Sequence, residues 1–145
     1  MVTIYNTTLS ATSQRHFSDS LGGGNLLFLS SETAGKCVDI PYGLTKAAIN
    51  SLVGGLARRV YNKGIRVNAI APGVTLTNMT KGDRINDTND LGREGAAGRW
   101  LLPEEIAEVA TFLISDASKC ITGEVLYCDA GSHLKINGTE SEYPL

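Results

Sequence analysis

The sequence predicts a three-layer α/β domain in which helices cover both faces of a parallel sheet. Three short apolar runs, at 25–29, 65–71 and 123–129, have the length and composition of strands covered on both faces. Helical patterns at 42–61 and from 103 alternate with these runs, and strands joined by helical crossovers form parallel sheets. The 145 residues suit one domain, which we place at 1–134, followed by a polar tail at 135–145.

The first segment, 2–18, carries apolar residues at loosely helical spacing: Ile4, Tyr5, Leu9 and Phe17. We expect a helix there, although four threonines lower its helical propensity. Glycines at 22–24 come next. A glycine turn that binds a phosphate follows a strand and opens a helix, whereas these glycines precede the run at 25–29. They therefore indicate a turn.

The longest predicted element is the helix at 42–61. Pro41 precedes it and suits the first turn of a helix, where an N–H has no intrahelical acceptor. The apolar residues of this helix form a broad stripe: Leu44, Ala48, Ile49, Leu52, Val53, Leu56, Ala57 and Val60. A stripe this wide favours burial on more than one side, against the sheet and against a second subunit.

The second half of the chain continues the alternation. The strand at 65–71 ends at Pro72-Gly73, and the polar segment 79–98 that follows is expected to be a loop, of the kind that often covers a binding site. A helix begins at Pro103, and its expected buried face comprises Ile106, Val109, Ala110 and Leu113. The last strand is predicted at 123–129, and we expect the polar residues from about Ser132 to be frayed.

Composition excludes several classes of function. The net charge of −2 provides no basic surface for nucleic acid, and no apolar run is long enough to span a membrane. The three cysteines, Cys37, Cys120 and Cys128, lack metal-ligand spacing and indicate reduced thiols in a cytoplasmic protein. The two histidines are far apart in the sequence, so we expect no metal site.

Tyr42 and Lys46 are the first candidates for chemistry. Residues four apart share one face of a helix, so the phenol and the ammonium lie side by side. A neighbouring cation favours an ionised phenol, and bringing a tyrosine from a pKa of about 10 to about 7 needs roughly 4 kcal/mol. A tyrosine tuned in this way can exchange a proton at neutral pH. The pair taken alone also fits a packed tyrosine beside a solvated lysine.

Five segments occur in an order that resembles the short-chain dehydrogenase/reductase family. They are L-S-S at 29–31, Y-G-L-T-K at 42–46, R-V-N-A-I-A-P-G at 66–73 followed by Thr77, G-R-W-L-L-P-E-E-I-A at 98–107, and I-T-G-E-V-L-Y-C-D-A-G at 121–131. The resemblance covers nearly the whole chain up to the tail. It implies a Rossmann-like fold and the transfer of a hydride between NAD or NADP and a small-molecule alcohol or carbonyl substrate.

The resemblance also implies roles for single residues. Tyr42 would be the general acid/base, and Lys46 would favour its ionised form and hydrogen-bond the nicotinamide ribose. Ser31 would hydrogen-bond the substrate oxygen. Ser31 lies eleven residues before Tyr42, slightly closer than is usual in the family, so Ser30 is the alternative, and a serine that merely ends a strand is a further one.

Two further implications concern the cofactor and the assembly. The residues that match the loop holding the nicotinamide end of the cofactor are Pro72, Gly73, Val74, Thr75 and Thr77. The long helices at 2–18 and 42–61 correspond to those that commonly form the family's dimer interface, so we expect a homo-oligomer. The choice between NAD and NADP, and the identity of the substrate, are not readable from these residues.

The resemblance is to the second half of such an enzyme. The N-terminal glycine-rich βαβ half, which holds the pyrophosphate, is absent from this sequence, and the family's asparagine has no clear counterpart, since Thr3 and Asn6 only fall near its position. We therefore expect a truncated, partial Rossmann-like domain, weak cofactor binding, and an unpaired apolar edge along 26–29. Two functions follow: an oxidoreductase polypeptide that is incomplete as it stands or complemented by another chain, or a non-catalytic oligomerisation module.

Overall fold

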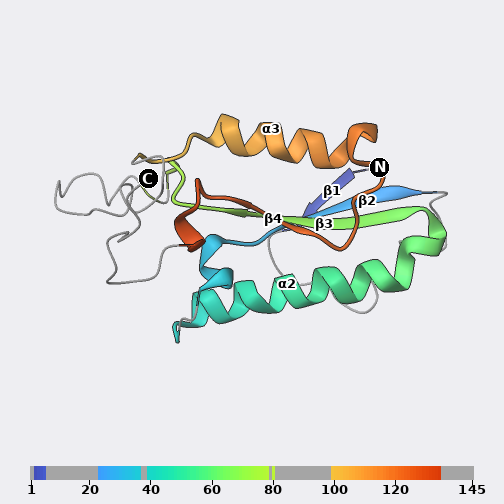
Figure 1. The fold of residues 1–145 in the computed structure, drawn as a ribbon, viewed down its shortest axis with the longest axis horizontal. Helices are drawn as coiled ribbons and strands as arrows, with labels where there is room; N and C mark the ends of the chain where they lie inside the picture. Colours follow the sequence, from blue (N-terminus) through green and yellow to red (C-terminus); the bar gives the residue numbers. More distant parts are fainter. Residues whose placement is uncertain (1, 6–22, 37–38, 79, 81–98, 135–145) are drawn as a thin grey trace, which may run out of the picture.

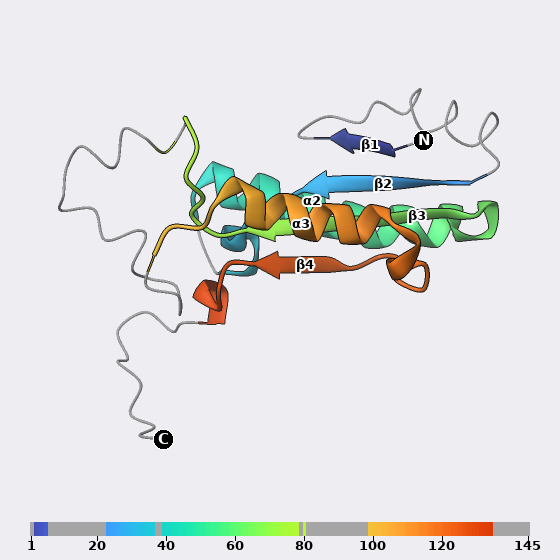
Figure 2. The same ribbon diagram turned by 90° about the horizontal axis from the view of Figure 1, so that it is seen from above.

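The computed structural model describes residues 2–5, 23–36, 39–78, 80 and 99–134. Within this part of the chain, four strands form one sheet in the order β1-β2-β3-β4, and every neighbouring pair is parallel. Their bounds are Val2–Tyr5 for β1, Gly24–Leu29 for β2, Ile65–Pro72 for β3 and Val125–Cys128 for β4. Figure 2 shows the strands side by side with their arrowheads pointing the same way. The predicted parallel sheet is therefore confirmed.

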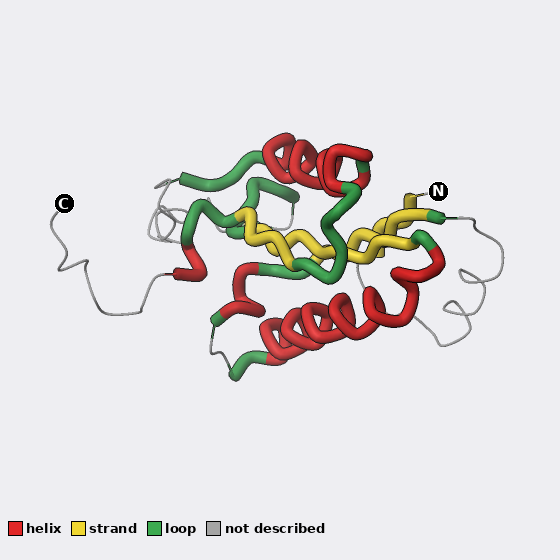
Figure 3. Tube along the Cα trace, turned by 45° about the vertical axis from the view of Figure 1, so that its right-hand side comes forward, coloured by secondary structure: helices red, strands yellow, loops and turns green. Residues whose placement is uncertain are grey.

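In the described part of the chain, two α-helices cover the sheet, α2 at Pro41–Val60 and α3 at Pro103–Ile114. They lie on opposite faces, which gives the three layers seen in Figures 1 and 3. Short 3₁₀ helices occupy the connections: η1 at Glu32–Gly35, η2 at Tyr61–Lys63, η5 at Asp116–Ser118 and η6 at Ser132–Leu134. No helix in the described ranges has the length and apolar character needed to cross a membrane.

The prediction of a helix at 2–18 is wrong for Val2–Tyr5, which form β1, and 6–18 lies outside the described residues. β1 pairs with β2 from Val2↔Asn25 to Tyr5↔Phe28. Branched and aromatic side chains fit a pleated surface well, and a neighbouring apolar strand reinforces that preference. The prediction of an unpaired edge along 26–29 is also wrong, because β1 pairs with β2 at that edge.

The core divides into two apolar clusters because successive side chains of a strand point to opposite faces. The cluster beneath α2 contains Leu26, Phe28, Val53, Leu56, Ala57, Ile65, Val67 and Ala69, with Ile49, Leu52 and Val60 packed against it. The cluster beneath α3 contains Leu27, Ile70 and Leu113, with Ile106, Val109 and Ala110 packed against it. The predicted buried face of α3 is confirmed. The stripe of α2 is confirmed except for Leu44 and Ala48, which are exposed.

Arg66 on β3 fixes the end of α3. Its guanidinium donates to the carbonyl oxygens of Leu113 at 2.9 Å, Ser115 at 2.9 Å and Ser118 at 3.0 Å. The last carbonyls of a helix lack intrahelical donors, and a cation there also complements the helix dipole. The side chain thereby fastens α3 and η5 to the sheet.

The carboxyl ends of the strands meet at one edge of the sheet, because the strands are parallel. Ser30 and Ser31 follow β2, Gly73 follows β3 and Asp129 follows β4. Helix α2 begins at this same edge and runs back along the sheet (Figure 1). Ligands of open α/β sheets bind outside such edges, so a site is expected at this edge.

Candidate active site

Tyr42 and Lys46 lie on the first two turns of α2, where Pro41 opens the helix. The Tyr42 side chain is exposed, whereas Lys46 is buried. The Lys46 ammonium lies 5.5 Å from the centroid of the Tyr42 ring and donates to the Leu29 carbonyl at 2.9 Å. Burial lowers the pKa of Lys46 below its ordinary value. The predicted pair therefore consists of a desolvated cation beneath a phenol that an incoming molecule can reach.

The two serines at the end of β2 have different environments, although both are buried. Ser30 Oγ donates to Asn50 Oδ1 at 2.6 Å and lies 3.3 Å from the Lys46 carbonyl. Ser31 caps η1: its Oγ accepts from the Thr33 N–H at 3.3 Å and from Thr33 Oγ1 at 3.0 Å. Ser30 is thus fastened to α2, while the Ser31 hydroxyl accepts twice and keeps its own proton.

The structure brings the strand end and the helix together but does not link every predicted residue. Lys46 contacts Leu29, and Ser30 contacts α2 through Asn50. Among the hydrogen bonds of the described residues, none joins the Tyr42 phenol to Ser30 or Ser31.

The segment after β3 is pinned on both sides. Gly73 N–H donates to the Cys128 carbonyl at 3.0 Å, and a Cβ atom on Gly73 would lie 2.9 Å from Asp129 Cα, so only glycine fits without displacement. Further along, Leu101 N–H donates to the Val74 carbonyl at 3.0 Å and the Leu76 N–H donates to the Leu101 carbonyl at 2.9 Å. The end of β4 and the start of α3 therefore fix this segment.

Hydroxyl groups complete the same segment. Thr75 Oγ1 donates to the Gly73 carbonyl at 2.9 Å, and Thr80 Oγ1 donates to the Thr75 carbonyl at 2.7 Å and accepts from the Thr77 N–H at 2.8 Å. The backbone N–H groups of Val74 and Thr75 have no acceptor among the described residues. Such amides can bind a polar group of a ligand, such as a carboxamide oxygen.

Sequence reasoning missed the residues that surround this edge from β4 and η6. His133 Nδ1 lies 2.7 Å from Asp129 Oδ2, and the His133 ring stacks on Tyr127. Lys36 lies 3.6 Å from Glu32 Oε2, an oxygen with no hydrogen bond in the described part of the chain. The spacing of four between Asp129 and His133 was visible in the sequence, but Asp129 was placed at the end of a strand and the residues from about Ser132 were expected to be frayed.

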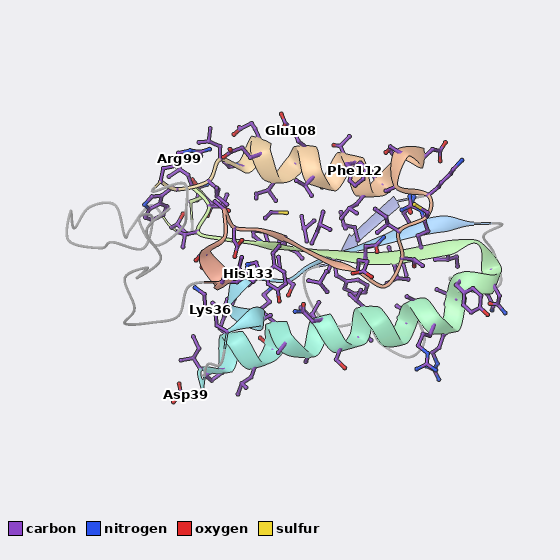
Figure 4. The ribbon with its side chains drawn as sticks, in the orientation of Figure 1. Lys36, Asp39, Arg99, Glu108, Phe112 and His133 are labelled. Atoms are coloured by element: carbon purple, nitrogen blue, oxygen red, sulfur yellow. The ribbon has the colours of Figure 1, made fainter. Side chains whose placement is uncertain are left out.

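The prediction that residues from about Ser132 fray is wrong for 132–134, which form η6. Ser132 is buried, and its Oγ accepts from Lys36 Nζ at 3.3 Å. Figure 4 shows Lys36 and His133 close together near the start of α2. In the described ranges, no group of three or more potential ligands could hold a metal ion.

A family model described as enoyl-(acyl carrier protein) reductase matches residues 5–133. The chain therefore belongs to the short-chain dehydrogenase/reductase family, whose members are NAD(P)-dependent oxidoreductases.

Three relatives illustrate the match. The 3-oxoacyl-[acyl-carrier-protein] reductase FabG of Chlamydia trachomatis is 46% identical over 62% of this chain, and an NAD-dependent glycerol dehydrogenase of Listeria innocua is 38% identical over 79%. The structure of the angucycline C-6 ketoreductase LanV with bound NADP superposes with a TM-score of 0.74 at 27% identity over 84% of this chain. The chain spans less than half of each relative: 36%, 46% and 48% of their lengths, respectively.

Proposed function

We propose that this chain carries the proton-transfer half of an NAD(P)-dependent oxidoreductase that acts on a small-molecule alcohol or carbonyl compound. The supporting observation is the pair on α2, in which the buried Lys46 ammonium lies 5.5 Å from the ring centroid of the exposed Tyr42. This pair begins at the carboxyl edge of the sheet, where ligands of such folds bind. Family membership supports the oxidoreductase class.

Tyr42 is the general acid/base in this proposal. Its exposed phenol can reach a substrate, and the Lys46 ammonium lies 5.5 Å from the centroid of its ring. In a reduction, the phenol gives its proton to the carbonyl oxygen; in an oxidation, the phenolate takes the proton of the hydroxyl. Lys46 keeps its place because Leu29 accepts one of its three protons, which leaves two for other acceptors.

Ser31 is the better candidate to bind the substrate oxygen. Ser30 uses its only hydroxyl proton on Asn50. The Ser31 oxygen accepts from Thr33, and its own proton has no acceptor among the described residues, so it is available to a substrate. We therefore assign Ser31 to substrate binding and Ser30 to the attachment of the strand to α2.

The donors at this edge fit the nicotinamide end of a dinucleotide. The N–H groups of Val74 and Thr75, which have no acceptor in the described part of the chain, suit a carboxamide, and Lys46 retains donors for a ribose hydroxyl. Pro72, Gly73 and Thr77 belong to the same pinned segment. When bound, NAD or NADP supplies the hydride acceptor or donor. The choice between them stays open, because one relative is named NAD-dependent and another holds NADP.

We also propose that residues outside this sequence bind the pyrophosphate of the cofactor. Among the described residues, no glycine-rich turn follows a strand and opens a helix. The proposal of a cytoplasmic location rests on cysteine usage, and Cys120 and Cys128 are both free thiols in the structure.

The outer face of α2 favours a homo-oligomer. The same face supports the alternative function, a non-catalytic binding module. Leu44 is 57% exposed and Ile40, just before the helix, is 49% exposed. Large apolar side chains that are adjacent and exposed commonly mark a contact surface. A second copy of this chain is the partner that we propose for this face.

A cofactor titration separates the two functions. We would titrate the purified chain with NADH and NADPH and follow nicotinamide fluorescence excited by energy transfer from Trp100. Trp100 is well placed because its neighbour Leu101 is hydrogen-bonded to the segment at 74–76. Saturable binding would mean that the missing pyrophosphate site is replaced, and the catalytic proposal then predicts that Lys46→Met weakens it while Lys63→Met, in η2 beyond the end of α2, leaves it unchanged. No binding up to millimolar cofactor would mean that the chain carries these residues without a working cofactor site, and would favour the module.

A further inference from the structure

Asn50 joins three elements at the edge of the proposed site. It lies one turn after Lys46 on α2 and is half-buried. Its Oδ1 accepts from Ser30 Oγ, after β2, at 2.6 Å, and its Nδ2 lies 3.5 Å from the Tyr127 hydroxyl, on β4. One amide thus provides an acceptor for one strand and a donor for another, which neither a carboxylate nor an apolar side chain can do.

Tyr127 is held firmly on its other side. Its ring stacks on His133, with centroids 4.0 Å apart and an interplanar angle of 19°. The buried Asp129 carboxylate lies 2.7 Å from His133 Nδ1 and accepts from the His133 backbone N–H at 2.7 Å. A Cβ atom on Gly35 would come within 2.7 Å of the Tyr127 hydroxyl, so η1 packs closely against that hydroxyl. The turn after β4 therefore fixes the group that faces the Asn50 amide.

The contact between Ser30 and Asn50 works together with a second one. Lys46 Nζ donates to the carbonyl of Leu29, the residue before Ser30, at 2.9 Å. Two consecutive residues at the end of β2 are thus attached to two consecutive turns of α2. If Ser30 loses its partner on α2, Lys46 is the residue that still holds the Leu29 carbonyl. The end of β2 can then move away from α2 and expose the ammonium to water.

We propose that Asn50 is a positioning residue: it holds the end of β2 against α2 so that Lys46 stays covered and Ser31 keeps its place beside the helix. Tyr127 and the Asp129–His133 turn set the orientation of its amide. The structural part of this inference is independent of the proposed function; its effect on turnover rests on that function.

The first test follows the Lys46 ammonium by NMR in a chain labelled on lysine side chains. The Lys46 signal is identified by its loss in Lys46→Met, and its pKa is measured in the unmodified chain, Asn50→Leu, Ser30→Ala, the double variant and the control Ser51→Ala. Ser51 follows Asn50 but is exposed.

We expect Asn50→Leu and Ser30→Ala each to move the Lys46 pKa up toward the ordinary lysine value, because water reaches the ammonium. The double variant should move it no further than the larger single change, since both remove the same contact. Ser51→Ala should leave it unchanged. The inference is overturned if the Lys46 pKa is unchanged in both single variants and only the unfolding midpoint falls, because Asn50 would then be a purely structural residue. Additive shifts would overturn it as well.

Ser30→Ala removes only one oxygen atom and keeps the test valid if Asn50→Leu does not fold. In the catalytically competent protein, Asn50→Leu should lower kcat by roughly tenfold to a hundredfold with little change in KM, as expected for misplaced groups. The NMR readout needs neither substrate nor cofactor. A chain that fails the cofactor titration can therefore still support this inference, and a chain that passes can still refute it.

Discussion

Replacing Arg66 with methionine should destabilise the fold through the end of α3. The guanidinium donates to the Leu113, Ser115 and Ser118 carbonyls at 2.9–3.0 Å and also lies 3.4 Å from the Ile121 carbonyl. Leu113 and Ser118 are buried, so water does not readily replace the lost donors there. Ser118 Oγ still donates to the Leu113 carbonyl at 2.9 Å, and the Ile121 N–H still donates to the Ser118 carbonyl at 2.8 Å, which limits the loss.

Both buried carbonyls keep a donor, so the variant loses the charged donor without leaving either acceptor unpaired. A hydrogen bond to a charged group contributes about 1.5–3 kcal/mol, and the expected loss is about 2 kcal/mol. For a chain of this length, that corresponds to a fall of roughly 6 °C in Tm. Methionine preserves most of the aliphatic volume, so the substitution mainly removes the donors.

The assay is urea unfolding followed by circular dichroism, with Arg58→Met as the matched control. Arg58 is exposed on α2, so its replacement should change the free energy of unfolding by less than about 0.5 kcal/mol. An Arg66→Met variant as stable as the control would refute the reasoning that these bonds fasten α3 and η5 to β3.

Two further predictions concern ionisable groups. Burial lowers the pKa of Lys46 in the folded chain. Between that lowered pKa and the ordinary lysine value of 10.5, the unfolded chain binds more protons, so stability rises with pH in that window. Lys46→Met should remove this rise in urea unfolding measured across alkaline pH. Arg99 binds both Glu105 oxygens, at 2.6 and 2.9 Å, and these hydrogen bonds lower the pKa of Glu105 to about 2 from its ordinary value of 4.5. The stabilisation is therefore present above pH 4.5 and is lost as the pH falls toward 2, and Glu105→Gln should abolish that acid dependence; an unchanged acid profile would contradict it.

Much of the fold was predictable because its signals are local. Pro41 and the apolar spacing on α2 mark that helix, and the apolar run of β2 between glycine and serine marks a covered strand. β1 was missed because four residues followed by threonines carry little periodicity. Its strand conformation depends on pairing with β2, which lies about twenty residues away in the sequence.

The residues of the candidate site also divide into those that local spacing reveals and those that only the fold reveals. Tyr42 and Lys46 are found by their spacing, since one helix brings them together without help from the fold. Ser30 and Ser31 cannot be told apart by spacing, because their roles depend on which hydroxyl faces α2 and which caps η1. Asn50 falls on the same face as Lys46, yet its partners come from distant strands and only the fold reveals them.

The most direct measurement of the central claim is the rate of NADH or NADPH oxidation with a panel of small carbonyl compounds, for the unmodified chain, Tyr42→Phe and the control Tyr61→Phe. Tyr61 is also exposed but lies at the opposite end of α2. Removing a general acid should cost about 10²- to 10⁴-fold in kcat, while circular dichroism shows an intact fold. The account predicts this loss for Tyr42→Phe and none for Tyr61→Phe. Turnover by the unmodified chain that Tyr42→Phe retains in full would contradict it.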